Sequence, residues 1–190
     1  PQDGIRAVDA AGISDTYVTA TESTDLTETV TFNTATGGTL KISTGTNNPQ
    51  AGLVEIASTT DTNNVKLLEF KLKAEDADVT IHDFPIGIAA ATGNVSLMVK
   101  RVRLMHGSTV LKTETISTGA AYNAVTFDNV DFELNKGDEE TFSIVADIFD
   151  ADSGAPDAND TLVASTTGAL TGWLVEDSQG DTLTESADIT

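Results

Sequence analysis

The sequence predicts an all-β protein built as an antiparallel sandwich, and three observations lead to this fold class. Apolar and polar residues alternate at period two in many short runs, as they do in half-buried strands. Threonine, which favours strands over helices, accounts for 30 of the 190 residues. No stretch of twelve residues has the i, i+3, i+4, i+7 apolar spacing of an amphipathic helix.

The first half of the chain predicts a hairpin followed by longer strands. The expected strands are residues 29–33, 39–43, 53–57, 65–74 and 79–81. A Gly-Gly turn at 37–38 joins the first two, because tight hairpin turns need residues that accept positive φ. In the fourth, Leu68, Phe70 and Leu72 share one face. Pro85 is expected to interrupt the pairing after the fifth, because proline has no N–H to donate.

The second half predicts seven further strands. They are residues 97–105, 109–116, 124–127, 130–134, 141–149, 161–164 and 170–176. Residues 106–108 and 135–138 are polar turns, and every second residue from Phe142 to Ile148 is apolar. Strands at this spacing, separated by polar turns, indicate an antiparallel sandwich of immunoglobulin type. The usual Cys-Trp-Cys core signature is missing, because the chain has no cysteine.

The N-terminal region fits the sandwich less well and predicts a separate part. Residues 15–28 are rich in threonine and acids and have few apolar residues, as in a linker or a peripheral strand. Residues 5–8 read as an extended strand. We therefore divide the chain into an N-terminal extension with donor strand and linker, residues 1–35, and a sandwich domain, residues 36–190.

The end of the chain repeats its beginning, 168 residues apart. The segment from Gly172 to Gly180 aligns without gaps onto the segment from Gly4 to Gly12. The aspartate and both glycines are identical in the two copies, and the second and fourth positions are apolar in both. The paired positions are Gly4 and Gly172, Ile5 and Trp173, Ala7 and Val175, Asp9 and Asp177, and Gly12 and Gly180. Repetition at a domain-sized period indicates stacking units.

This repetition predicts assembly by strand donation. The segment from Gly4 to Gly12 would leave its own sandwich and complete the sheet of the adjacent copy. It would lie at a place equivalent to residues 172–180, or pair beside it. A donated strand satisfies the unpaired N–H and C=O groups of an open edge and buries alternate residues, here Ile5, Ala7 and Val8. Such a head-to-tail contact does not close, so it propagates as a homopolymer.

Charge limits the partners that the chain can have. The net charge is −20, which excludes nucleic acid because phosphate contacts need lysine and arginine. Residues 66–112 hold seven of the ten bases, whereas residues 128–190 hold sixteen acids and one lysine. This asymmetry would steer copies into contact, or it is a solvated acidic surface. No apolar run is long enough for membrane insertion. Pro1 rather than Met opens the sequence, which leads us to expect a processed or excised chain.

An acidic loop is the best candidate for a metal site. Five aspartates lie within residues 147–160, and Gly154 and Pro156 bend the segment. They are Asp147, Asp150, Asp152, Asp157 and Asp160. Calcium takes six to eight hard oxygen ligands, which such a loop can supply. The spacing does not fit an EF-hand, so the alternatives are a non-helical structural Ca²⁺ loop and a simple polar turn.

The sequence offers little for catalysis, and we expect no enzyme. His82 and His106 are its two histidines, and no nucleophile-elbow or zinc-protease motif occurs. Aromatic residues are also few, and Trp173 lies within an alternating strand, where we expect it in the core. Asn94 and Asn159 match the glycan acceptor pattern, which also arises by chance.

The order of several segments resembles a known kind of repeat. Residues 65–81, 102–110, 134–138 and 143–148, closed by 173–180, resemble immunoglobulin-like sandwich repeats of large bacterial surface proteins. The N-terminal strand adds a resemblance to strand-donating filament subunits. The resemblance covers about residues 50–185 and implies an extracellular or cell-surface structural module. A single repeat with an extra leading strand departs from the tandem pattern.

Two functions follow as expectations. The first is a structural subunit of an extracellular filament or surface layer, assembled from copies of itself by strand donation from the N-terminus. The alternative is an adhesin or a carbohydrate-binding module of a larger cell-surface protein. The alternative predicts a groove with exposed aromatic residues, or a solvent-facing calcium site, and an N-terminal strand that folds back on its own domain.

Overall fold

The computed structural model describes residues 6–8, 14–16, 37–152, 156, 160–166 and 172–183. The chain divides into two compact units, residues 1–35 and 36–190, which we describe separately. In the first unit, β1 (Arg6–Val8) pairs antiparallel with β2 (Ser14–Thr16). The expected N-terminal strand is thus one arm of a hairpin, and its partner lies at the start of the segment that we expected to be a linker.

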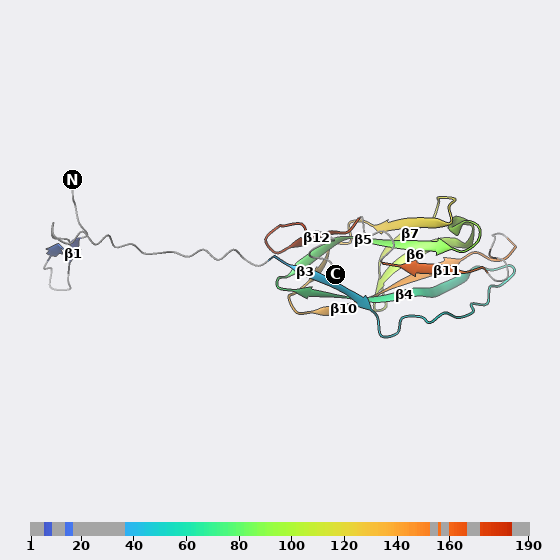
Figure 1. The fold of residues 1–190 in the computed structure, drawn as a ribbon, viewed down its shortest axis with the longest axis horizontal. Helices are drawn as coiled ribbons and strands as arrows, with labels where there is room; N and C mark the ends of the chain where they lie inside the picture. The colour runs from blue at the N-terminus through green and yellow to red at the C-terminus, as the bar shows by residue number, and fades with distance from the viewer. Residues whose placement is uncertain are drawn as a thin grey trace. The chain divides into compact units, whose positions relative to one another are not determined.

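The second unit contains two sheets, which face each other in Figure 1. The first has the strand order β3-β4-β10-β6-β7, and each pair in it is antiparallel. Its strands are β3 (Thr39–Thr44), β4 (Thr62–Glu75), β6 (Val99–His106), β7 (Thr109–Thr115) and β10 (Glu139–Ile148). A single helical turn, α1 (Val95–Met98), precedes β6.

The second sheet is organised around β5 (Val79–Ala90). Residues 79–81 pair with both β9 (Phe132–Leu134) and β12 (Leu174–Asp177), and residues 87–89 pair with both β8 (Tyr122–Phe127) and β11 (Leu162–Ser165). Because a strand has two edges, β9 and β12 lie on opposite edges, as do β8 and β11. All of these pairs are antiparallel, so the all-β antiparallel sandwich that the sequence predicts is confirmed.

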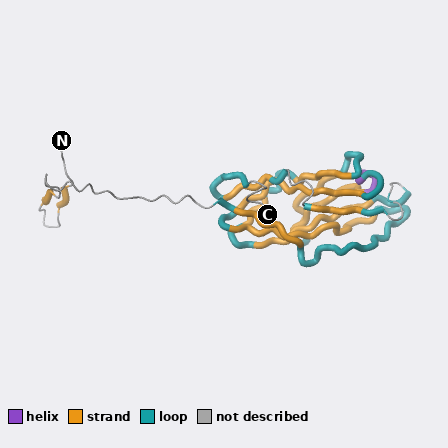
Figure 2. Tube along the Cα trace, viewed as in Figure 1, coloured by secondary structure: helices purple, strands orange, loops and turns teal. Residues whose placement is uncertain are grey.

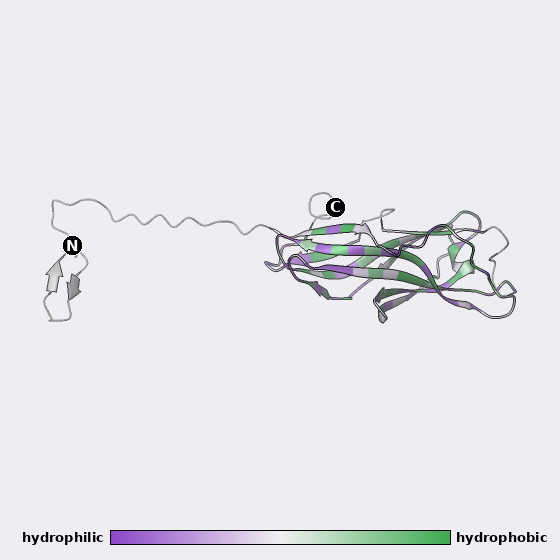
Figure 3. Cartoon of the chain, turned by 90° about the horizontal axis from the view of Figure 1, so that it is seen from below, coloured by the Kyte–Doolittle hydropathy of each residue, from purple (hydrophilic) through white to green (hydrophobic). Residues whose placement is uncertain are grey.

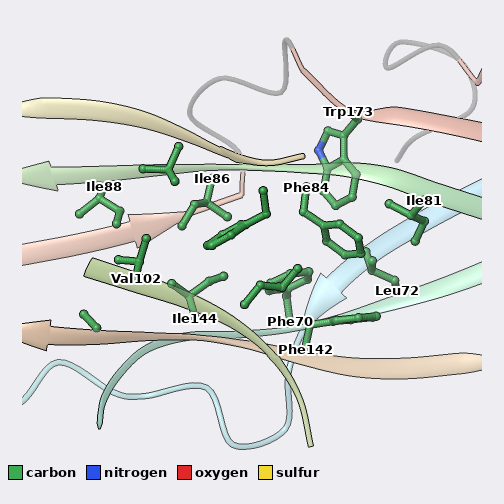
Figure 4. Packing of buried hydrophobic residues seen from close by; sticks show 14 of the residues in the cluster. Phe70, Leu72, Ile81, Phe84, Ile86, Ile88, Val102, Phe142, Ile144 and Trp173 are labelled. Atoms are coloured by element: carbon green, nitrogen blue, oxygen red, sulfur yellow. The ribbon is translucent and has the colours of Figure 1, made fainter. Parts of the chain in front are cut away.

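Aromatic rings connect the two sheets through the core. Trp173 packs on Phe84 of β5, Phe84 on Phe142 of β10, and Phe142 on Phe70 of β4, with ring centroids 5.4, 5.2 and 5.7 Å apart (Figure 4). Apolar residues alternate with polar ones along the strands (Figure 3). The period-two pattern therefore places one face of each sheet in the shared core, where apolar burial stabilises the fold.

Residues 53–57 do not form the expected strand. They belong to the long loop between β3 and β4 (Figure 2), and Leu53 is fully exposed. The loop contacts β4 at Glu69, where Gly45 donates a backbone hydrogen bond to the Glu69 carbonyl (2.9 Å). β10 covers one edge of β4, whereas β3 covers the other edge only at residues 70–75. An alternating pattern shows that a segment can pair, but burial against a partner decides whether it does, and Leu53 and Val54 are both exposed. The expected strand at 29–33 lies outside the described residues.

Pro85 does not interrupt β5, contrary to our expectation. On one edge it lies opposite Thr126 of β8. On the other edge it falls between the residues that pair with β12 and those that pair with β11. No ladder partner lies beside it on that edge within the described residues. The missing proline N–H is therefore tolerated in the middle of a long buried strand.

Candidate functional site

The C-terminal copy of the repeated segment is a hairpin that closes the second sheet. Trp173 and Val175 are buried, and β12 pairs with β5 at residues 79–83. After a turn the chain returns, so that Glu176 forms an antiparallel bridge with Thr182. The Leu183 N–H donates to the Val175 carbonyl (2.8 Å). We call this segment, residues 172–183, the closing hairpin.

Asp177 fixes the turn of the closing hairpin. Its buried carboxylate accepts hydrogen bonds from the backbone N–H groups of Gly38 (3.1 Å), Gln179 (2.9 Å) and Asp181 (3.0 Å). The Gly38 bond and the turn bonds outweigh the effect of burial and hold the pKa of Asp177 below its usual value. A Cβ at Gly38 would lie 3.0 Å from the Asp177 Cβ and 3.1 Å from the Val79 Cγ1, so this close approach favours glycine. The matched aspartate therefore has a structural role.

The N-terminal hairpin has the register of the closing hairpin. In the first unit Val8 pairs with Ser14, and adding the repeat offset of 168 gives Glu176 and Thr182, which also pair. The next pair, Ala7 with Asp15, corresponds to Val175 and Leu183, which share a backbone hydrogen bond. The sequence repeat is thus also a repeat of strand pairing. Gly4, Ile5, Asp9 and Gly12 lie outside the described residues.

Asp147 of the predicted metal loop is already bound by arginines. Its buried carboxylate accepts from Arg101 Nε (2.5 Å), from Arg103 and from the Asn64 N–H (3.1 Å). Burial favours the neutral acid, but the Asn64 N–H and the two guanidinium groups outweigh it, and the pKa of Asp147 is lowered. The carboxylate therefore stays charged and serves to join β10 to β6.

The predicted loop ligands that the structure describes do not gather into a metal-binding group. Asp150 is buried, Asp152 is exposed, and Asp160 accepts a hydrogen bond from the Thr92 hydroxyl. No group of three metal-ligating side chains forms within the described residues. Asp157 lies outside them, as does the acceptor site Asn159, so the calcium loop stays a prediction.

The positive charges of the sandwich pair internally. Of the lysines and arginines from 37 to 152, all but Lys136 form a salt bridge with a carboxylate. Lys136 donates to the Asp76 carbonyl (2.8 Å). The basic stretch at 66–112 is thus largely neutralised by its own neighbours. This stretch therefore presents little net positive charge that could steer a second copy.

The histidines also have local partners. His82 of β5 contacts Asp131 (2.6 Å) and Glu176 (3.7 Å), and the hydrogen bond to Asp131 raises the pKa of His82. His106 contacts Glu140 (2.8 Å) and packs on Phe142. Asn94, the predicted glycan acceptor, is half-buried immediately before α1, and its glycosylation stays a prediction.

A shallow groove of about 220 Å³ lies between the end of β7 and β8. It is lined by residues 114–118 and 123–126, which include no aromatic side chain. Apolar ligand sites usually present hydrophobic and aromatic side chains with a few convergent polar groups. The groove therefore lacks the platform that we expected of a carbohydrate-binding module.

Sequence reasoning missed the charged residues whose ion pairs and hydrogen bonds connect the strands and loops. Glu69 of β4 accepts from Lys66 (2.8 Å) and from the Asn47 N–H (2.7 Å), and Lys66 is the main cause of its lowered pKa. Glu69 lies with Lys71 and Lys73 on the face of β4 opposite Phe70 and Leu72, and this period-two run of charges was the sequence signal for it. Arg101 and Arg103 showed a similar signal, since they point to one side of β6 at period two.

No described helix is long and apolar enough to cross a membrane. Comparison of the chain with protein-family models, with curated proteins and with solved structures found no match.

Proposed function

We propose that this chain is a structural subunit of an extracellular filament or surface layer, in which copies join head to tail through the N-terminal hairpin. The shared register of β1–β2 and the closing hairpin is the observation that supports this proposal most strongly. The sandwich already has its own closing hairpin. The N-terminal hairpin, which repeats that element, is therefore suited to pair with the sheet of another sandwich.

The chemistry of the sandwich favours a structural role. Many of its described charged side chains form salt bridges or turn hydrogen bonds, and the groove between β7 and β8 is lined by one charged side chain, Glu114. The closing hairpin and the Asp147 cluster join strands that are far apart in sequence. We therefore propose no enzymatic activity. An immunoglobulin-like fold and a location at the cell surface remain parts of this proposal.

Calcium binding by the acidic loop is a separate part of the proposal. Asp147 is committed to Arg101 and Arg103, which leaves Asp150, Asp152, Asp157 and Asp160 as candidate ligands. Ca²⁺ that binds only the folded state raises the Tm by mass action. We expect a higher Tm in millimolar CaCl₂ than in EDTA. An equal shift with Mg²⁺, or none, would reject a calcium loop.

One observation favours the alternative of an adhesin or carbohydrate-binding module. Val163, Ala89 and Tyr122 lie opposite one another on β11, β5 and β8, and Val163 and Tyr122 are 60% and 43% exposed. This row is a small apolar patch with one aromatic ring. Binding of the full chain to a glycan array, lost in Tyr122→Ala, would support the alternative over assembly.

Deletion of the N-terminal hairpin tests the filament proposal. We expect the full chain to form filaments or large oligomers, and a variant lacking residues 1–14 to remain monomeric. Light scattering after gel filtration and negative-stain electron microscopy measure both. In the control, residues 18–30 are replaced by a Gly-Ser segment of equal length, and assembly should persist. Assembly of the deletion variant would contradict the proposal.

A further inference from the structure

We propose that the paired strands β1 and β2 of one copy dock on β5 of a second copy, along Val79–Asp83, in the place held by that copy's own closing hairpin. The inference deepens the proposed function, on which it rests, by naming the acceptor surface and its register. The partner is a second copy of this chain.

The acceptor surface is one edge of β5. There Leu174 pairs with Asp83, Val175 with Ile81 and Glu176 with Thr80. The opposite edge of Thr80 and Ile81 is occupied by β9. The edge toward β12 is therefore the one that a closing hairpin completes, through backbone hydrogen bonds that do not depend on side-chain identity.

The common register defines how the donor would pair. An offset of 168 places Ala7 at the position of Val175, opposite Ile81, and Val8 at the position of Glu176, opposite Thr80. In both hairpins a residue of the first strand pairs with the residue six positions later in the chain. Val8 pairs with Ser14, and Glu176 pairs with Thr182. The β1–β2 hairpin thus has the same internal pairing as the hairpin that now occupies the acceptor edge.

Side-chain size decides which hairpin holds the site in an intact copy. The closing hairpin buries Trp173, Val175 and Leu183. The corresponding residues of the N-terminal hairpin are Ile5, Ala7 and Asp15. The closing hairpin removes more apolar surface from water, and Asp15 would bring a carboxylate to the place where Leu183 is buried, so the closing hairpin wins when both compete. Docking of the N-terminal hairpin is therefore an exchange, which proceeds when the acceptor's own hairpin is released.

Cysteine cross-linking between full-length chains tests this register, because the protein has no cysteine of its own. The donor variant is Val8→Cys. The acceptor variant combines Thr80→Cys with Val175→Asp, which puts a charge in a fully buried position and releases the closing hairpin. We expect a mixed disulfide at a yield at least about tenfold above that with an acceptor retaining Val175, in line with competition for one site.

Two controls set the scale of that experiment. Thr80→Cys with Glu176→Cys in a single chain should form an intramolecular disulfide, because the two residues are paired. An acceptor with Thr113→Cys and Val175→Asp places the thiol at an exposed position on β7, outside the site. If the Thr80 acceptor cross-links no better than the Thr113 acceptor, the proposed docking site is wrong.

A graft keeps the test decisive if the Val175→Asp acceptor fails to fold. Residues 172–180 of the full chain are replaced by the sequence of residues 4–12, and a matched variant receives the same nine residues in scrambled order. We expect the graft to unfold cooperatively, at a lower Tm than the parent but above that of the scrambled variant. Equal Tm values for the two would overturn the inference.

The results separate this inference from the proposed function. Filaments that need residues 1–14 but give no Val8–Thr80 cross-link would support the filament and reject this docking surface. A specific cross-link, or a folded graft, without filaments from the full chain would support the docking surface and reject the filament.

Discussion

The carboxylate of Asp177 accepts a hydrogen bond from the backbone N–H of Gly38, 139 residues earlier in the chain. This contact joins the turn of the closing hairpin to the residue just before β3. It shows that the end of the sandwich is fastened to its beginning.

Replacement of Asp177 should loosen this junction. Asp177→Ala leaves three N–H donors without their acceptor, and we expect the Tm to fall by about 5 °C. Hydrogen exchange should quicken at Gly38 and Gln179. The control is Asp181→Ala, which removes an exposed side chain and should change the Tm by less than about 1 °C. Similar losses in both variants would contradict a specific role for Asp177.

The Asp147 cluster should be a major contributor to stability. Asp147→Ala leaves Arg101 and Arg103 without their shared carboxylate, and we expect a loss of about 3 kcal/mol in the free energy of unfolding. Urea denaturation measures it. Glu139→Ala is the matched control, because Glu139 pairs with Lys71 at the surface, and it should cost less than about 1 kcal/mol. A loss at Asp147 no larger than at Glu139 would refute the expectation.

Gly45 should tolerate no side chain. A Cβ there would lie 2.5 Å from the Glu69 Cγ and 2.9 Å from the Glu69 carbonyl carbon, so β4 or the loop must move. We expect Gly45→Ala to lower the free energy of unfolding by about 2 kcal/mol or more. In Gly52→Ala the new Cβ meets nothing closer than 3.6 Å, and stability should stay within about 0.5 kcal/mol of the parent.

His82 should make stability depend on pH near neutrality. Its pKa in the folded state lies above the usual 6.5, mainly through the hydrogen bond to Asp131. The protonated ring therefore stabilises the fold below about pH 6.5, and this contribution is lost as the pH rises through the folded-state pKa. Asp131 and Glu176 are well exposed, so we expect less than about 1 kcal/mol.

Comparison with His82→Gln isolates this contribution. We expect urea midpoints, measured from about pH 5.5 to about pH 8.5, to show that the parent becomes more stable relative to the variant only at the acidic end of this range. A difference between the two proteins that is the same at every pH would assign the effect to packing. Glu69 and Asp177 act oppositely, because their lowered pKa values make stability fall only in stronger acid.

Much of the fold could be predicted from the sequence because burial leaves a period-two pattern. The alternation in residues 65–74 and 141–149 identified β4 and β10, which form the centre of the first sheet. Residues 53–57 show the same alternation but stay in a loop, where Leu53 and Val54 are exposed and bury no apolar face. Pro85 was misjudged for a related reason, because the sequence does not show where a strand changes partner.

The sequence by itself determined the strand-rich fold and the repeat that links residues 4–12 to 172–180. Composition and periodicity are local properties, and they persist in any arrangement of the strands. Only the tertiary structure decided that Asp147 binds two arginines and that Asp177 binds Gly38, because these partners come from distant strands. The register shared by the two hairpins likewise came only from the observed strand pairing. Backbone hydrogen bonds form whatever the side chains are, so the sequence does not reveal them.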